Sequence, residues 1–301
     1  YKYNSCIMEP WDGPASIPFT DGKYIGALLD RNGLRPSRYT VTKDGYVVMS
    51  SETGVVDLDP ENILSHGRLE PGKMFLVDMD EGRIINDTEI KDNIITQRPY
   101  KKWINKNVLQ LSDISYTGNR TPDEKIDFEV RLKIFGYTKE DFQKIIIPMS
   151  ISGKESIGSM GIDTPLAVLS KKPQLVYNYF KQLFAQVTNP PLDGIREEII
   201  TDTSLSLGKS YNIFDVIEEH SISLNIKNPI ISNEDLDKIK YINHEKFKSR
   251  SLDCLYEFKK GHNGIEEALD EIVLKIESFI DEGTNIIILS DRKVSKKMAP
   301  I

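Results

Sequence analysis

The chain has 301 residues, of which 39% are hydrophobic and 28% charged, and its formal net charge is -7 at pH 7. This composition is typical of a globular protein, and the length allows one large domain or two ordinary ones. Acidic and basic residues are interleaved, so no basic stripe is available for a nucleic-acid backbone. No apolar run approaches the roughly 20 residues of a membrane-spanning helix. We expect neither nucleic acid nor a membrane as a partner.

Residues 1–97 are predicted to form mainly antiparallel sheet, because short β-rich runs alternate with turn sequences such as Asp44-Gly45 and Asp80-Glu81-Gly82. Residues 98–127 contain turn-forming residues such as Pro99 and show little periodicity, which predicts a linker and a domain boundary. The expected hairpins pair the run 38–42 with 46–51, and the run 73–78 with 83–85.

The pattern changes to a helical period in residues 128–301. Thr138 and Ser232 each precede an aspartate by three residues, as in a capping box, and each predicts the start of a helix. Apolar residues between Pro173 and Gln186 follow helical spacing and predict a helix that faces the core.

The clearest periodic segment is 264–283, in which apolar residues recur at i, i+3, i+4 and i+7 until Gly283 ends the predicted helix. The apolar run 285–289 follows it. A helix followed by a buried strand is typical of α/β units with parallel strands. The sequence therefore predicts an α+β region followed by an α/β domain.

The two cysteines, Cys6 and Cys254, lie far apart, and the four histidines are scattered. We therefore expect no metal or cofactor site built from this chain alone, and reduced thiols of the kind found in intracellular proteins. The chain begins at Tyr1 without a basic or apolar leader and ends at Ile301 just after a strand-like run. Both ends are expected to be internal to a longer polypeptide.

Residues 8–14 form a stiff segment that carries Glu9 and Asp12. Either carboxylate could act as an acid, a base or an amine-binding group, or both could satisfy backbone donors in a rigid turn, which we favour. Residues 30–36 place Arg31 and Arg35 around a glycine turn after an apolar strand. Their guanidinium groups could clamp an anionic ligand or pair with structural acids such as Glu52, and both alternatives remain open.

Two loops in the second region also carry polar groups. Residues 156–161 superficially resemble a phosphate-binding glycine loop, but the Gly-Lys-Ser/Thr sequence does not follow. Thr188 and Asn189 precede two prolines and could line a polar cavity or cap a helix, and we favour the cap. Cys6 stands neither at a free N-terminus nor near a histidine in the sequence, and no catalytic residue is predicted in this chain.

Several of these segments resemble the glutamate synthases. The sequences MEPWDGPA at 8–15, LDRNGLRPSRY at 29–39, SSETGV at 50–55 and GRLEPGKMFLVD at 67–78 resemble the closing part of the family's class II glutaminase domain. The sequences FGYTKEDF at 135–142, GSMGIDTPLAVLS at 158–170, YFKQLFAQVTNPPLDGIREE at 179–198 and IIILSDR at 286–292 resemble its central domain. The resemblance implies the end of an N-terminal-nucleophile (αββα) domain in residues 1–97 and an incomplete α/β central domain in residues 128–301.

The resemblance implies that the parent enzyme is an oxidoreductase acting on CH-NH2 donors. It hydrolyses glutamine, passes ammonia through an internal tunnel to 2-oxoglutarate, and reduces the resulting imine with electrons from FMN. FMN, the iron–sulfur cluster and NAD(P)H belong to that parent enzyme. The implied partners are the N-terminal glutaminase part and the FMN-binding synthase domain of the same polypeptide, and a reductase subunit or domain. The family's nucleophile precedes this segment, so we expect the segment alone to be inactive.

Within the family's tunnel, the resemblance makes Met160, Thr188 and Asn189 candidate wall residues. It also favours the NAD(P)H-dependent type, located in the cytoplasm or in a plastid or other organelle. Residues 201–230 depart most from the family pattern. An alternative interpretation is a stand-alone, non-catalytic scaffold or regulatory protein derived from a glutamate synthase.

Overall fold

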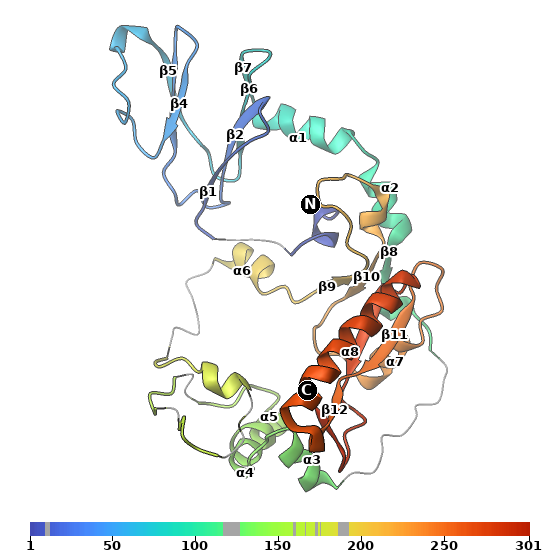
Figure 1. The fold of residues 1–301 in the computed structure, drawn as a ribbon. Helices are drawn as coiled ribbons and strands as arrows, with labels where there is room; N and C mark the ends of the chain where they lie inside the picture. The colour runs from blue at the N-terminus through green and yellow to red at the C-terminus, as the bar shows by residue number, and fades with distance from the viewer. Residues whose placement is uncertain are drawn as a thin grey trace. The chain divides into compact units, whose positions relative to one another are not determined.

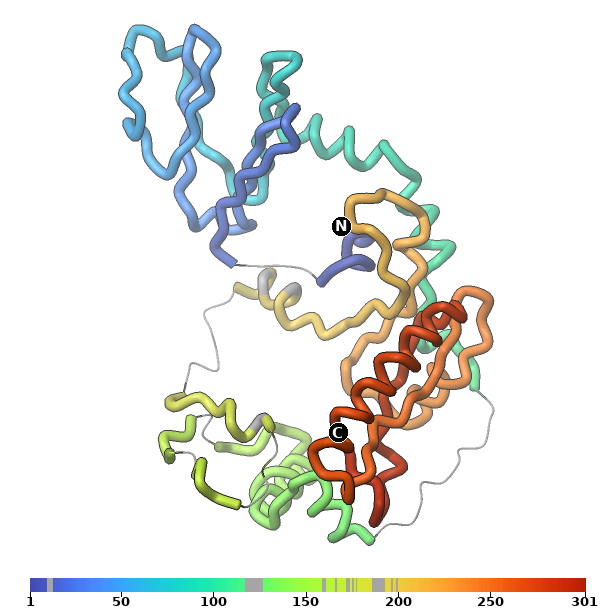
Figure 2. The backbone as a smooth tube through the Cα atoms, in the orientation of Figure 1, coloured from blue at the N-terminus to red at the C-terminus, as the bar shows by residue number. Residues whose placement is uncertain are grey.

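The structure is a computed structural model that describes residues 1–9, 13–116, 127–158, 161–165, 167–171, 174, 176–185 and 193–301. Figures 1 and 2 show its ribbon and its backbone trace. The chain divides into two compact units. The first unit consists of Tyr1–Gln110 and Asp193–Pro229, and the second consists of Leu111–Leu192 and Ile230–Ile301. In the described part of the chain, no helix is long and apolar enough to cross a membrane.

The first unit contains a four-stranded antiparallel sheet with the strand order β1-β2-β6-β7 (Figure 1). Strands β6 and β7 form one of the two hairpins predicted from the sequence, and Gly82 in its turn has a φ of +63°. Only glycine adopts such a conformation readily, which is why the local sequence predicts this turn. The bounds of the strands are β1 (Ser16–Thr20), β2 (Tyr24–Leu29), β6 (Met74–Asp78) and β7 (Arg83–Ile85).

A second antiparallel sheet in the same unit has the strand order β4-β3-β5. The β3–β4 hairpin confirms the other prediction, with Gly45 at a φ of +92° in its turn. Its strands are β3 (Arg38–Thr42), β4 (Val47–Ser50) and β5 (Ile63–Arg68). Between the two sheets lies a small core centred on Ala27, Leu29, Leu69 and Phe75. This core joins the sheets because each contributes apolar side chains to it.

Two cross-strand pairs combine an aromatic ring with a glycine. Phe19 lies opposite Gly26 in the β1–β2 pair, and Tyr39 lies opposite Gly67 in the β3–β5 pair. A Cβ atom at position 67 would stand 2.1 Å from Cζ of Tyr39. The ring therefore covers the glycine and occupies the space of its missing side chain.

A third sheet completes the first unit, with the order β8-β10-β9, in which β10 is parallel to β8 and antiparallel to β9. Helix α2 and strand β8 lie within residues 98–127, where the sequence analysis predicts a linker. The bounds are β8 (Val108–Gln110), β9 (Leu205–Leu207), β10 (Ser223–Ile226), α1 (Asp87–Thr96), α2 (Tyr100–Asn107) and α6 (Gly194–Ile200). The parallel pair joins segments that lie more than a hundred residues apart in the sequence, and no local turn sequence specifies such a pairing.

In the second unit, Thr138 and Asp141 form the predicted capping box, and Ser232 caps the helix that follows it. The strands pair as β11 with β13, in parallel, and as β12 with β14. The predicted helix over 264–283 is α8, so these sequence signals are confirmed. The helices are α3 (Phe128–Ile134), α4 (Lys139–Asp141), α5 (Ile147–Ser152), α7 (Asn233–Lys240) and α8 (Gly261–Asp281), with a π-helical turn η4 (Phe142–Ile146). The strands are β11 (Ser249–Asp253), β12 (Leu255–Glu257), β13 (Ile286–Ser290) and β14 (Met298–Pro300).

The core-facing helix predicted between Pro173 and Gln186 is wrong for the described residues. Only a short 3-10 turn, η5 (Val176–Phe180), forms there, and Phe180 and Phe184 are 81% and 72% exposed. Aromatic and β-branched residues have modest helix propensity. A short amphipathic segment of this kind forms a stable helix only when its apolar face is packed. The remaining short 3-10 turns are η1 (Asn4–Cys6), η2 (Pro60–Asn62), η3 (Leu111–Asp113), η6 (Glu218–Ser221) and η7 (Phe258–Lys260).

The carboxylate of Asp78, at the end of β6, is expected to make the stability of the first unit depend on pH in acid. It is 3% exposed and accepts hydrogen bonds from the backbone N–H groups of Glu81 (3.0 Å) and Asp80 (2.9 Å), which hold its pKa below the ordinary value. A pKa that is lower in the folded state contributes stability above the unfolded value of about 3.9 and loses it as the pH falls through the folded value.

We therefore expect Asp78→Asn to flatten the decline in melting temperature below about pH 4, because the amide keeps an acceptor oxygen but does not titrate. Asp92→Asn removes a carboxylate from the exposed side of α1 and is the matched control. Melting temperatures measured from pH 6 down to pH 2.5 test this expectation. The same steep acid decline in the Asp78 variant as in the wild type would contradict it.

Candidate functional site

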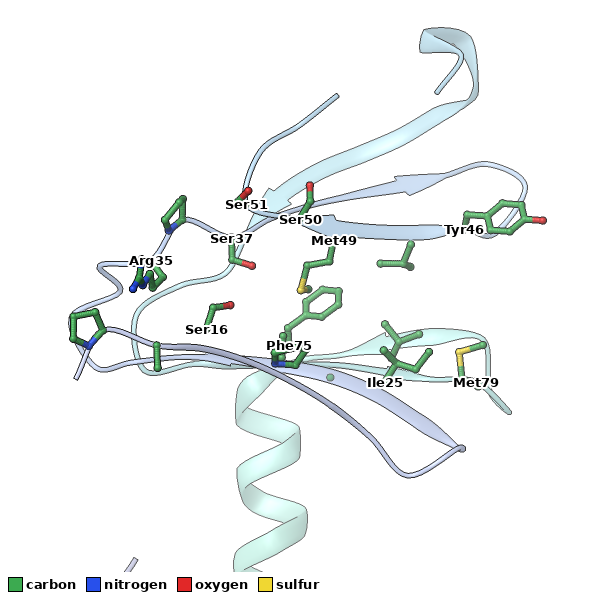
Figure 3. A pocket seen from close by; sticks show the side chains of 18 of the residues that line it. Ser16, Ile25, Arg35, Ser37, Tyr46, Met49, Ser50, Ser51, Phe75 and Met79 are labelled. Carbon is green, nitrogen blue, oxygen red and sulfur yellow. The ribbon is translucent and has the colours of Figure 1, made fainter. Parts of the chain in front are cut away.

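A cleft lies between the two antiparallel sheets of the first unit and has a volume of about 1060 Å³. Figure 3 shows Met49 and Phe75 near its middle, and Ile25, Tyr46 and Met79 toward one end. The opposite end is polar. There the side chains of Ser16, Arg35, Ser37 and Ser51 border the cleft, while Ser50 lies near Met49. The cleft therefore has an apolar floor and one end that can donate hydrogen bonds.

Arg35 lies at the polar end of the cleft, as Figure 3 shows, and its side chain is exposed. Within the described residues, it forms no ion pair with Glu52 or with any other acid. Ser37 beside it is 7% exposed, and its carbonyl oxygen accepts a hydrogen bond from the N–H of Leu69 at 3.0 Å. Ser37 thus anchors the segment between Arg35 and the start of β3.

Arg31 sits in a tight turn that Asp30 holds in place. The carbonyl oxygen of Asp30 accepts hydrogen bonds from the N–H groups of Gly33 (3.0 Å) and Gly72 (3.1 Å), and its carboxylate accepts one from the N–H of Asn32 (3.1 Å). Gly33 has a φ of +60°, and a Cβ there would stand 2.6 Å from Cγ of Pro71. Only glycine fits this turn, so the backbone at Arg31 is closely defined.

The partner of Arg31 is Asp193. Its Nη2 lies 3.4 Å from each carboxylate oxygen of Asp193, and Nδ2 of Asn32 donates to the same carboxylate at 3.3 Å. Asp193 also accepts a hydrogen bond from the N–H of Ile195 at 3.1 Å, at the start of α6. Of the two interpretations left open by the sequence, this geometry supplies a structural acid for Arg31, although a different one from Glu52.

The remaining candidates are placed as follows. Glu9 is exposed. Asp12, Met160, Thr188 and Asn189 lie outside the described residues. Their roles therefore remain predictions.

A buried polar cluster in the first unit was missed by the sequence analysis. The hydroxyl of Tyr3 donates to the carbonyl of Ile217 at 2.8 Å, and Nδ2 of Asn107 donates to Oγ of Ser221 at 2.8 Å. His220 is 4% exposed and its Nε2 lies 3.1 Å from the carbonyl oxygen of Asn212. Burial raises the pKa of Tyr3, so its hydroxyl stays protonated and donates. The cluster satisfies the buried polar groups of three distant segments, and no sequence motif links those segments.

The described residues were considered for a metal site. In the parts that the structure describes, no group of three or more His, Cys, Asp or Glu side chains is placed to hold a metal ion. Cys6 and Cys254 are free and lie in different units. Because an iron–sulfur cluster needs a set of converging thiolates, these two cysteines do not fit one.

Two family models match the chain in tandem. Residues 1–103, which include the two sheets and the cleft between them, match the class-II glutamine amidotransferases. Residues 130–301 match the family described as the glutamate synthase central domain, which covers more than half of the chain. The chain therefore belongs to the glutamate synthase family.

Curated relatives agree with this assignment. The chain is 46% identical, over 301 residues, to the glutamate synthase [NADPH] large chain of Bacillus subtilis, and the match covers 100% of this chain and 19% of that protein. It is 38% identical over 312 residues to the glutamate synthase [NADH] of Schizosaccharomyces pombe, covering 100% and 15%. It is 41% identical over 295 residues to the ferredoxin-dependent glutamate synthase of Antithamnion sp., covering 97% and 19%. The chain thus spans less than a fifth of the length of these relatives.

Proposed function

We propose that this chain is the part of a glutamate synthase that links its glutamine-hydrolysing site to its reductive-amination site. The tandem order of the two family matches, 1–103 and then 130–301, is the observation that carries this proposal. The parent protein then makes glutamate from glutamine and 2-oxoglutarate. The reducing cofactors and the remaining catalytic groups belong to the rest of the polypeptide, which accounts for most of the length of the relatives.

The first unit supports the glutaminase part of this proposal. Its two antiparallel sheets and the apolar cleft between them are compatible with the closing strands of an αββα sandwich. The helix α8 followed by β13, parallel to β11, is compatible with an α/β central domain. The first two relatives named above carry NADPH or NADH in their names, and on this basis we propose the NAD(P)H-dependent type.

Ammonia has to travel between the two sites as a neutral molecule. A carboxylate in the wall would favour ammonium and hold it, whereas a narrow apolar wall with a few neutral hydrogen-bonding groups lets ammonia pass. Met160, Thr188 and Asn189 have the required chemistry, being one apolar and two neutral polar side chains. We therefore propose them as tunnel-wall residues.

The test is Thr188→Val in the full-length enzyme, since valine preserves the shape of the side chain and removes the hydroxyl. We expect roughly fivefold more ammonia to escape per glutamate formed, the effect of losing one hydrogen bond worth about 1 kcal/mol. Glutamine consumed, glutamate formed and free ammonia are measured together.

The control is Thr201→Val, because the Thr201 hydroxyl donates to the carbonyl of Glu197 at the exposed end of α6. This variant should keep the stoichiometry of the wild type. If Thr188→Val also keeps it, Thr188 is not part of the tunnel wall. If the wild type itself releases one ammonia for every glutamine consumed, the channelling function is wrong.

A further inference from the structure

A groove in the first unit lies between the N-terminal segment, the end of α1, the start of α2 and the loop before η6. Its volume is about 1080 Å³, and all of its lining segments belong to the same compact unit. It shares no lining residue with the cleft between the two sheets. This groove, called the α1–α2 groove below, is therefore a separate surface of the molecule.

The shape of the α1–α2 groove is held by Tyr3, one of the residues that line it. Tyr3 is 6% exposed, and its ring packs against that of Tyr100 on α2 with centroids 5.0 Å apart. Its hydroxyl donates to the carbonyl of Ile217 at 2.8 Å and accepts from the N–H of Ile217 at 3.1 Å. One side chain thus joins three of the segments that form the groove, so the groove is formed before anything binds in it.

The apolar side chains of the groove are exposed to solvent. Ile94 and Ile95, near the end of α1, are 44% and 63% exposed, and Val216 on the opposite segment is 41% exposed. Ile94 also borders a smaller hollow of about 270 Å³, where Phe19 is 43% exposed. The exposed apolar surface therefore extends from one hollow to the next, as it does at sites of interaction.

The charged side chains that line the groove are all positive. They are Lys2, Arg98, Lys101 and Lys102, and the described residues of the lining include no Asp or Glu. Lys106, one turn further along α2, pairs with Glu218 at 2.7 Å. Within the described chain, none of the four groove cations forms an ion pair with a carboxylate. In a chain with a net charge of -7, four such cations around an apolar groove favour an acidic occupant.

The combination of charge and apolar surface favours a polypeptide segment over a small anion. An anion would use the cations alone and would leave Ile94, Ile95 and Val216 in water. The chain spans only 19% and 15% of the first two relatives named above, so most of their length lies outside it. A segment of the same polypeptide has a far higher effective concentration at the groove than a separate protein has.

We propose that the α1–α2 groove binds an acidic segment of the parent polypeptide that lies outside residues 1–301. Apolar side chains of this segment pack against Ile94 and Ile95, and its carboxylates pair with Lys101 and Lys102. The inference rests on the proposed function only in that the native protein is the long enzyme. The contact ties the amidotransferase match, which contains α1 and the start of α2, to another part of that enzyme.

Carbodiimide cross-linking of the full-length enzyme, read out by mass spectrometry of peptides, identifies the occupant directly. The reagent joins an amine to a carboxylate when the two groups are in ion-pair contact. We expect Lys101 or Lys102 to be joined to an Asp or Glu of the same polypeptide outside residues 1–301. Lys23 and Asp80, whose charged groups lie 3.1 Å apart in the same unit, are the internal positive control.

A variant tests the apolar half of the contact. Ile95→Asp removes an apolar side chain and adds a charge that repels an acidic segment, so the cross-links of Lys101 and Lys102 to that segment should fall roughly fivefold. Asn93→Asp adds the same charge at an exposed position of α1 outside the groove and should keep them. Both variants should retain the Lys23–Asp80 cross-link, which shows that the unit is folded.

The remaining outcomes overturn the proposal. One is the absence of cross-links from Lys101 and Lys102 in a sample where Lys23 and Asp80 are joined. Another is a cross-link to a different protein or to a second copy of the enzyme, which a mixture of isotopically labelled and unlabelled subunits distinguishes. A third is an equal yield in the Ile95 and Asn93 variants. These results leave the proposed function intact, whereas a native polypeptide of only 301 residues overturns both.

Discussion

Truncation of Leu224 to alanine is expected to lower the free energy of local unfolding of the β8-β10-β9 sheet by about 3 kcal/mol. Leu224 is 0% exposed and lies on the central strand, β10. In the strand register it faces Leu109 of β8 on one side and Leu207 of β9 on the other. Removal of its side chain leaves a cavity between two leucines whose strands are fixed by the ladder, so the site cannot collapse fully.

Hydrogen exchange of the peptide 205–226 in the full-length protein measures this effect directly. The matched control is Leu205→Ala on β9, in the same sheet, where the side chain is 46% exposed and its loss should cost less than about 1 kcal/mol. Equal exchange rates in the two variants would contradict the prediction. This sheet joins the two matched regions. Strand β8 follows shortly after the amidotransferase match, whereas β9 and β10 lie in the central-domain match.

The elements that could be predicted from the sequence are those whose signals are local. The β3–β4 hairpin follows from Asp44-Gly45, and the capping box at Thr138 follows from an aspartate three residues later. The helix α8 is long enough for its periodicity to be unambiguous. In each case the residues that determine the structure lie within a few positions of one another.

The remaining features depend on distant residues. The parallel pairing of β8 with β10 and the Arg31–Asp193 contact link segments more than a hundred residues apart, and one sequence carries no signal for either. The sequence therefore left open whether Arg31 binds an anionic ligand or pairs with a structural acid, and it carried no signal for Asp193. The helix predicted around Phe180 was wrong for a related reason. The spacing of apolar residues predicts an apolar face but does not show which surface packs against it.

Alanine at position 67 is expected to destabilise the β4-β3-β5 sheet by about 2 kcal/mol, although alanine normally stabilises a strand relative to glycine. Gly67 does not have a positive φ, so its backbone conformation is open to alanine. The obstacle is the ring of Tyr39, whose Cζ would stand 2.1 Å from the new Cβ. That ring also packs against Phe75 at a centroid distance of 4.5 Å and so is held from both sides.

A double-mutant cycle with Tyr39→Leu tests this explanation. Tyr39→Leu alone loses the contact with Phe75, but Gly67→Ala should cost nothing further in that background, because the clashing ring is absent. Gly158→Ala, where no atom of the described residues lies within 4 Å of the new Cβ, is the control for the substitution itself. Hydrogen exchange in the peptide 63–68 provides the free energies. If the two costs simply add, the ring is not the obstacle. If they do not add, the ring of Tyr39 is the reason that β5 requires glycine at position 67. This strand belongs to one of the two sheets that enclose the candidate cleft.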